Sequence, residues 1–296
     1  MLLSILVVSR SHKLLNQMLY SISKATCLEK INVEILCSWN GSTVDESKIK
    51  NNSGYNFKIA ERKKYHFATN INSLAKLAIG EILLIINDDI ILDNNSIDHA
   101  IKQLLNNNQI GLVTGKLRYK NGMIQHAGIT FDSNNIPYHK FEKLIKSNSD
   151  LISKDNQIIP AASGALIFIK KALFLEIGFN EKYEICGEDI ELSLDIREKK
   201  DYIILFAPKV SGIHLSSATR KKNNQYGNSI NDLKRMKERR DCFINTVSKN
   251  QLIDELNDMR NQLDILKVIE LKRNKLKIFF KNYIRKNYTF TLLPKG

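Results

Sequence analysis

Short apolar runs alternate with helical apolar spacings along the first two thirds of the chain. Leu2–Ser9 is almost entirely apolar and predicts a buried strand. Lys13–Lys24 predicts a helix, because Leu15, Met18 and Ile22 recur on one helical face. This alternation predicts an α/β domain whose strands are joined by right-handed crossovers.

The same patterns continue to about residue 214. Further strands are predicted at Val33–Cys37, Phe57–Ala60, Ile110–Thr114, Ala161–Ile169 and Tyr202–Ala207. Further helices are predicted at Asn70–Ile79, Ser96–Asn106, Lys171–Ile177 and Ile190–Lys200, with Ser96 as a helix cap. Leu117–Phe131 predicts a hairpin around Asn121-Gly122, and the irregular Pro137–Asn156 predicts a loop near the site.

The most informative stretch is Ile82–Asp93, in which five apolar residues run into Asn87-Asp88-Asp89. Ligands bind at the carboxyl ends of strands in open α/β sheets, and adjacent carboxylates repel each other unless a cation lies beside them. This pattern therefore indicates a divalent cation with phosphate in its shell. A solvated Asn-Asp-Asp turn is the alternative interpretation.

Two later features have both a structural and a chemical interpretation. Glu188-Asp189 precedes a predicted helix, where acidic residues stabilise the helix dipole, so these residues either cap the helix or take part in catalysis. His214 is either a structural histidine or a metal ligand.

Charge is distributed unevenly along the 296 residues, which carry a net charge of +14. From Arg220 onward there are 19 Lys and Arg against 8 Asp and Glu, so +11 of the +14 lies in the last quarter. The preceding part is nearly neutral, which indicates that the tail meets an anionic surface or presents a solvated helical face. The four scattered cysteines, together with an apolar start that resembles a strand rather than a signal peptide, predict a cytoplasmic protein.

In this order, the motifs resemble those of the family 2 glycosyltransferases over roughly residues 3–220. The resemblance rests on Ser9-Arg10, Asn40-Gly41-Ser42, Phe67-Ala68-Thr69-Asn70, Gly80-Glu81, Asn87-Asp88-Asp89, the hairpin Asn121-Gly122-Met123-Ile124-Gln125-His126-Ala127-Gly128, Gly164-Ala165, Gly178-Phe179-Asn180-Glu181, Glu188-Asp189-Ile190-Glu191-Leu192 and His214-Leu215-Ser216-Ser217-Ala218-Thr219-Arg220. The hairpin is similar to that of a rhamnosyltransferase-like subgroup. The resemblance implies the GT-A nucleotide-diphospho-sugar transferase fold, a Rossmann-like mixed sheet flanked by helices.

The resemblance also implies roles for individual residues. Asp89 would be the direct ligand of Mg²⁺ or Mn²⁺, and His214 would complete the metal or diphosphate site. Asp189 would be the general base with Glu188 beside it, and Gly164 and Ala165 would form a small-residue wall on the acceptor side. The donor would be bound by Ser9, Arg10, Trp39, Asn40, Asn70, Asn87 and Asp88. Many family members have an aspartate at the position of Trp39, whose indole either stacks on the base or packs in the core.

Two domains are predicted, a catalytic domain over 1–220 and a basic helical extension over 221–296. Ile230–Ile269 is helical in pattern, and its leucines and Met259 follow a four-three spacing that suits packing on the core or a homodimer seam. Leu276–Tyr288 interleaves aromatic and basic residues, which suits either an anionic membrane surface or a packed helix. Peripheral attachment to the inner face of the plasma membrane is one expectation.

These features predict an inverting, metal-dependent glycosyltransferase that moves a sugar from a UDP- or dTDP-type donor to a glycan or lipid-linked acceptor in surface polysaccharide synthesis. A sugar-nucleotidyltransferase is the first alternative, although the turn after the first strand lacks the glycine-rich loop that holds a triphosphate. A non-catalytic sugar-nucleotide-binding or nucleic-acid-binding protein is the second. We expect no nucleic-acid partner, because the cations gather outside the predicted sheet.

Overall fold

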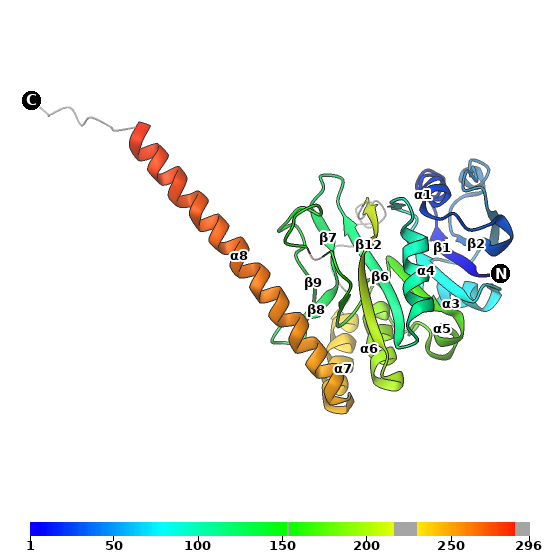
Figure 1. Cartoon of the computed structure of the whole chain (residues 1–296). Coiled ribbons are helices and arrows are strands. Elements are labelled where there is room, and N and C mark those ends of the chain that lie inside the picture. The colour runs from blue at the N-terminus through cyan, green and yellow to red at the C-terminus, as the bar shows by residue number, and fades with distance from the viewer. Residues whose placement is uncertain (153, 216–229, 288–296) are drawn as a thin grey trace, which may run out of the picture.

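A computed structural model describes residues 1–152, 154–215 and 230–287, with the side chains of its last helix described as far as Lys275. This part of the chain forms a ten-stranded mixed sheet with helices on both faces and a small two-stranded sheet, followed by a helical arm (Figure 1). The main strand order is β10-β12-β6-β11-β4-β1-β2-β3.

One half of the sheet is parallel. It consists of β1 (Leu3–Ser9), β2 (Val33–Trp39), β3 (Asn56–Glu61) and β4 (Ile82–Ile86). β1 pairs in parallel with both β2 and β4, and β2 pairs in parallel with β3. β1, β2 and β4 are buried throughout, because helices cover both of their faces.

The other half of the sheet is mixed. Its strands are β5 (Ile90–Leu92), β6 (Ile110–Arg118), β7 (Ile124–His126), β10 (Gln157–Ile158), β11 (Leu166–Lys170) and β12 (Ile203–His214). β11 lies antiparallel between β4 and β6, while β12 runs parallel to β6 and antiparallel to β5. β8 (Ile129–Phe131) and β9 (Pro137–His139) form a separate two-stranded sheet.

The helices divide between the two faces of the sheet. α1 (His12–Ala25) and α4 (Ser96–Asn106) pack on the face that contains Leu3 and Ile5. α3 (Phe67–Leu77), α5 (Lys171–Ile177) and α6 (Glu188–Lys200) pack on the face that contains Leu6. Successive residues of β1 therefore face opposite cores, as the period of two requires. Two short helical segments, η1 (Lys30–Asn32) and α2 (Thr43–Glu46), complete this part of the chain.

Two local predictions are wrong. Ser96 is the first residue of α4 rather than its cap, because Asn95 holds the cap position with a φ of 59°. The Ser96 hydroxyl instead donates to the Ser211 carbonyl, at 2.9 Å. The predicted loop after Pro137 begins with strand β9, whose three residues pair with β8 and are too few to show a periodicity.

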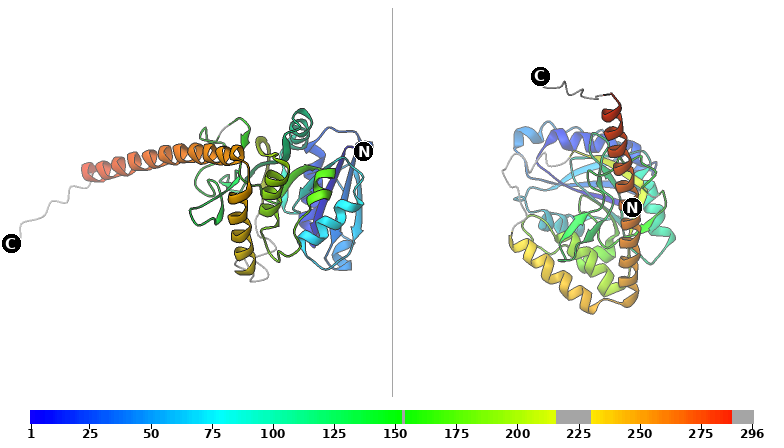
Figure 2. Two further views of the ribbon diagram at one scale, coloured as in Figure 1. Left: turned by 90° about the horizontal axis from the view of Figure 1, so that it is seen from below. Right: turned by 90° about the vertical axis from the view of Figure 1, so that its left-hand side faces the viewer.

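The helical arm consists of α7 (Ile230–Thr246) and α8 (Lys249–Asn287), which leaves the body of the molecule and projects from it (Figures 1 and 2). α8 buries a polar face near its start and exposes an apolar one. Its buried side chains include Gln251, Glu255, Asp258 and Gln262, whereas Leu256, Met259 and Leu263 are 54%, 43% and 53% exposed. The four-three stripe therefore faces solvent, while Leu266, the last residue of the stripe, packs against the core.

The polar face of α8 is held by buried ion pairs. Glu255 binds Arg197 of α6 at 2.5 Å and Arg240 of α7 at 2.5 Å. Asp258 binds Lys140, which follows β9, at 2.5 Å, and both side chains are almost fully buried. The start of α8 is thereby fixed against the core.

Some predicted features lie outside the described residues. These are the domain boundary at 220/221, the motif residues 216–220 and the side chains of Leu276–Tyr288, so the division into 1–220 and 221–296 stays a prediction. No helix within the described ranges is long and apolar enough to cross a membrane.

Candidate active site

The Asn87-Asp88-Asp89 turn connects β4 to β5 and opens onto a cavity of about 510 Å³. The turn is held at both ends, because the Asn87 amide donates to the Ala165 carbonyl at 3.1 Å and the Ile90 amide donates to Asn87 O at 3.2 Å. The same cavity contains most of the predicted site residues, namely Ser9, Arg10, Asn87, Asp88, Asp89, Gly164, Ala165, Glu188, Asp189 and His214.

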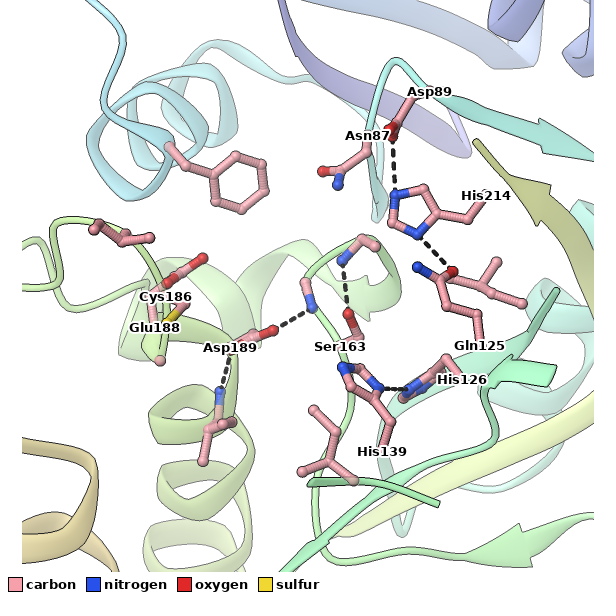
Figure 3. A pocket seen from close by; sticks show the side chains of 18 of the residues that line it. Asn87, Asp89, Gln125, His126, His139, Ser163, Cys186, Glu188, Asp189 and His214 are labelled. Carbon is pink, nitrogen blue, oxygen red and sulfur yellow. Dashed lines mark hydrogen bonds and ion pairs between the residues drawn. The ribbon is translucent and has the colours of Figure 1, made fainter. Parts of the chain in front are cut away.

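Asp89 and His214 form a pair on one wall of the cavity (Figure 3). Nε2 of His214 lies 3.0 Å from Oδ1 of Asp89, and its Nδ1 lies 2.7 Å from Oε1 of Gln125. Because an amide oxygen only accepts, His214 Nδ1–H is the donor to Gln125. Gln125 thereby fixes the ring so that Nε2 faces the carboxylate, an arrangement common for metal-bound histidines.

Asp88 lies beside this pair and is almost completely buried. The Ser9 hydroxyl donates to its Oδ2 at 2.6 Å. Burial raises the pKa of Asp88 to about 7, with a contribution from neighbouring Asp89, although the Ser9 hydrogen bond opposes the shift. Two carboxylates are therefore held together in a poorly solvated place, an arrangement that a cation would stabilise.

Asp189 lies in the first turn of α6 and lines the same cavity as Asp89. Its Oδ2 accepts from the Gly164 amide at 2.6 Å and its Oδ1 accepts from the Ile190 amide at 2.8 Å (Figure 3). Burial raises the pKa of Asp189, and these two amides oppose that rise. Asp189 is therefore oriented by the backbone and is more basic than an exposed aspartate.

Two glycines lie next to Asp189 or to the start of its helix. A Cβ at Gly164 would lie 3.2 Å from Asp189 Cβ, so the small residue makes room for the carboxylate as well as lining the cavity. Gly187, which precedes α6, has a φ of 118°, and a Cβ there would lie 2.6 Å from Tyr183 Cε1. Only glycine suits this entry into the helix.

Three of the predicted donor residues do not line the cavity. Trp39 is 2% exposed and packs in the core, with Nε1 donating to Ser42 O at 3.3 Å, so packing rather than base stacking describes its place. Asn40 binds the Lys63 carbonyl. Asn70 is buried, accepting from the His66 amide at 2.7 Å and donating to Ser38 Oγ at 2.8 Å. The amides of Asn40 and Asn70 thus hold loops and strands in place.

Several lining residues were not assigned a role from the sequence, including Gln125, His126, Tyr138, His139 and Glu142. Gln125 and His126 belong to the hairpin motif that supports the family resemblance, so that motif was the available signal. His139 and Glu142 come from the irregular Pro137–Asn156 stretch, where no pattern marks them. Arg10 is the one Lys or Arg among the described lining residues.

Asp89 and His214 are spaced like two ligands of a divalent metal. Two ligands bound at right angles about 2.1 Å from one Mg²⁺ lie roughly 3 Å apart, and Asp89 Oδ1 and His214 Nε2 are 3.0 Å apart. No cluster of three or more metal-ligating side chains occurs in the described parts of the chain. The spacing of Asp89 and His214 therefore fits two ligands of one cation, and phosphate and water would complete its shell, as is usual for Mg²⁺ at substrate phosphates.

Comparison with known proteins gave relatives by sequence and by structure. No family model matches the chain. The O-antigen biosynthesis protein RfbC of Myxococcus xanthus is 27% identical over 155 residues, which is 51% of this chain and 12% of that protein. The chain thus spans only a small part of this curated relative.

Two solved structures resemble the fold at low sequence identity. GalNAc-T7 with UDP, GalNAc and Mn²⁺ has a TM-score of 0.56 and 15% identity, over 72% of this chain and 43% of that one. The mannosyltransferase PcManGT of Pyrobaculum calidifontis, in complex with GDP-Man and Mn²⁺, has a TM-score of 0.53 and 12% identity, over 97% of this chain and 81% of that one. The sheet order and these likenesses show that the chain has the GT-A glycosyltransferase fold, as the resemblance predicted.

Proposed function

We propose that this chain is an inverting, metal-dependent glycosyltransferase that moves a sugar from a nucleotide-diphosphate donor to a hydroxyl of a glycan or lipid-linked acceptor. The observation that carries the proposal is the placement of Asp89, His214 and Asp189 around one cavity of about 510 Å³. The fold supports a glycosyltransferase, and the RfbC relative supports a role in surface polysaccharide synthesis.

The donor end of the cavity is the end with Arg10, Asp88, Asp89 and His214. Asp89 and His214 would hold Mg²⁺ or Mn²⁺, which supplies Lewis-acid stabilisation of the charge that develops on the departing diphosphate. Arg10 adds a fixed positive charge for phosphate. Asp88, held by Ser9, is placed to accept hydrogen bonds from the donor ribose or sugar. The donor is of UDP or dTDP type in this proposal.

Asp189 is the proposed general base. The acceptor oxygen forms a bond to the anomeric carbon while the bond from that carbon to the diphosphate oxygen breaks, and the hydroxyl proton passes to the Asp189 carboxylate. The raised pKa of Asp189 favours proton uptake at that step. A single displacement from the face opposite the leaving group inverts the anomeric configuration. Glu188, which also lines the cavity, lies beside the base.

We also propose that α8 pairs with α8 of a second copy. Leu256, Met259 and Leu263 follow the narrow four-three spacing of a coiled-coil seam and are about half exposed. Between Lys249 and Leu271 the chain carries both charge signs, with acidic residues in excess, which disfavours an anionic membrane as the partner of this stripe. Membrane attachment through the more basic Leu276–Tyr288 stays a separate prediction.

A donor panel tests the proposed function. Nucleotide sugars carrying UDP, dTDP or GDP are incubated with the full chain and Mn²⁺, and nucleotide diphosphate release is measured with and without an acceptor glycan. We expect one donor class to be consumed and EDTA to stop the release. Consumption of no donor with any metal would leave the binding-only alternative, and release of pyrophosphate from a sugar phosphate and a nucleoside triphosphate would favour a nucleotidyltransferase.

Asp189→Asn tests the base separately. Removal of a general base lowers turnover by about 10²- to 10⁴-fold, while donor affinity should change little. Asp264→Asn makes the same substitution at an exposed aspartate outside the cavity and should have wild-type turnover. Equal turnover of the Asp189 variant and the wild type would remove Asp189 from this role.

A further inference from the structure

One wall of the cavity is formed by the hairpins that follow β6 and has no role in the proposed chemistry. We call it the hairpin wall and define it by Tyr119, His126, Ile129, Tyr138, His139 and Glu142. It contains aromatic rings, two imidazoles and one carboxylate. Aromatic faces with convergent hydrogen-bonding groups are the usual lining of a small-molecule site.

The two imidazoles are paired, and their protons can be assigned from the hydrogen-bond network. Nδ1 of His126 lies 3.0 Å from Nδ1 of His139 (Figure 3). His126 is 1% exposed, and burial lowers its pKa well below the usual value, so the ring is neutral near pH 7. Its Nε2 is buried and has no hydrogen-bond partner among the described residues.

A neutral imidazole carries one N–H, and a buried N–H without an acceptor is rarer and costlier than a buried lone pair. The proton of His126 therefore belongs on Nδ1, where it donates to Nδ1 of His139. His139 then carries its own proton on Nε2. His139, Ser163 and Asp189 all line the same cavity and are labelled in Figure 3. The pairing with His126 thus orients the N–H of His139, a residue that lines the same cavity as the proposed base.

The helical arm braces the strand that carries His139. On one side of this residue, the Tyr138 hydroxyl accepts from Gln262 Nε2 of α8 at 3.1 Å. On the other side, Lys140 binds Asp258 of α8 at 2.5 Å. Both neighbours of His139 are therefore tied to α8, which limits its movement.

The charges of this wall restrict the ligand. Burial raises the pKa of Glu142, but hydrogen bonds from Tyr119 and Lys143 outweigh it and lower the pKa, so Glu142 is anionic near neutral pH. Asp189 and Glu188 border the same cavity, while its one described Arg or Lys, Arg10, lines the proposed donor end. A phosphate-bearing acceptor would meet these carboxylates, whereas hydroxyl groups hydrogen-bond to them.

We propose that the hairpin wall is the acceptor subsite, that it takes an uncharged sugar, and that His139 donates a hydrogen bond to an acceptor hydroxyl. This inference rests on the proposed glycosyltransferase function. In this proposal the polar face of α8 positions the acceptor subsite, because Gln262 and Asp258 of that face bind the residues on either side of His139.

The experiment compares transfer with hydrolysis. With the donor identified by the panel and Mn²⁺ present, the full chain is given a set of methyl hexosides and, in parallel, the corresponding hexose 6-phosphates, and both sugar transfer and donor hydrolysis are measured. We expect transfer to the methyl hexosides only. His139→Phe should lower the transfer-to-hydrolysis ratio about tenfold, chiefly through a higher KM for the acceptor, as expected for one lost hydrogen bond. His139→Gln, which retains an N–H donor, should recover the ratio to within about threefold of the wild type.

Glu142→Gln tests the charge selection, because it removes the charge of a partly exposed wall residue and should allow transfer to hexose 6-phosphates. An unchanged ratio for His139→Phe would overturn the role of His139, and equal use of both acceptor sets by the wild type would overturn the charge selection. If circular dichroism shows that His139→Phe does not fold, the transfer-to-hydrolysis ratio of His139→Gln and the use of hexose 6-phosphates by Glu142→Gln test the proposal instead. Turnover of a donor without these effects refutes the subsite alone, whereas neither transfer nor hydrolysis of any donor refutes the proposed function and the subsite with it.

Discussion

Glu255→Gln should destabilise the whole protein, although the residue lies in the helical arm. Glu255 accepts from Arg197 Nη1 at 2.5 Å and from Arg240 Nη1 and Nη2 at 2.9 and 2.5 Å. Arg197 is 1% exposed and Arg240 6%, so neither guanidinium can turn to water after the substitution. Glutamine keeps the shape of the side chain but leaves two buried positive charges without their carboxylate.

The magnitude follows from this geometry. Removing one partner of a buried ion network costs about 3–5 kcal/mol, because the remaining charge stays desolvated. For a protein of this length, 1 kcal/mol shifts Tm by roughly 2–4 °C, so a loss of about 3–5 kcal/mol should lower Tm by about 6–20 °C. The free energy of unfolding is measured by urea titration followed by circular dichroism, with thermal melts in parallel.

Glu238→Gln is the matched control. Glu238 lies 3.8 Å from Lys234, and both side chains are mostly exposed, so this substitution should change stability by less than about 1 kcal/mol. A loss below 1 kcal/mol for Glu255→Gln would mean that the arm does not support the core, and our account of its polar face would be wrong.

Three further predictions concern other parts of the molecule. Ser9→Ala removes the hydrogen bond to buried Asp88 and should lower the free energy of unfolding, measured by urea titration at pH 8, by about 1–3 kcal/mol. An unchanged free energy of unfolding would show that the Ser9 hydroxyl does not stabilise the Asp88 carboxylate. Leu256→Glu should convert a dimer into a monomer in sedimentation, while Leu175→Glu, at an exposed leucine of α5, should not; a monomeric wild type would refute the seam. The free energy of unfolding should fall below about pH 4.3, the pKa of glutamate in the unfolded chain. Burial raises the pKa of Glu255, but Arg240 and Arg197 lower it by more, so the stabilisation by Glu255 is complete above the unfolded-state pKa and is lost as the pH falls through the lower pKa of the folded state. Urea titrations that give the same free energy of unfolding throughout the acid range would contradict this.

The sheet could be predicted from the sequence where the apolar pattern was long. Ile82–Ile86 is buried throughout and ends at the acidic turn, as its pattern indicated. Asp89 and Asp189 line one cavity, and this was predicted from the order of the family motifs rather than from the hydrophobic pattern. Elements of three residues, such as β9, carry too little pattern to predict, which is why His139 was missed.

Side-chain direction was harder to predict than element type. The strand predicted at Val33–Cys37 extends two residues further to Trp39, whose ring is buried in the core rather than directed into the cavity. The orientation of α8 was unpredictable for a different reason. Hydrophobic patterning favours burying its leucines, but specific charge pairs with Arg197, Arg240 and Lys140 turn the polar face inward instead. Such pairings depend on residues far apart in the sequence.

The pairing of β5 with β12 has a consequence for how the site assembles. His214 lies opposite Ile90, and the Leu215 amide donates to Asp89 O at 2.9 Å, so strand alignment alone brings together residues from distant parts of the chain. A shift of one position would replace the imidazole by Ile213. Neither half of the chain can make this pair by itself. An ion that needs both side chains would therefore bind only after β5 and β12 have paired, so its binding would report that this part of the sheet has formed.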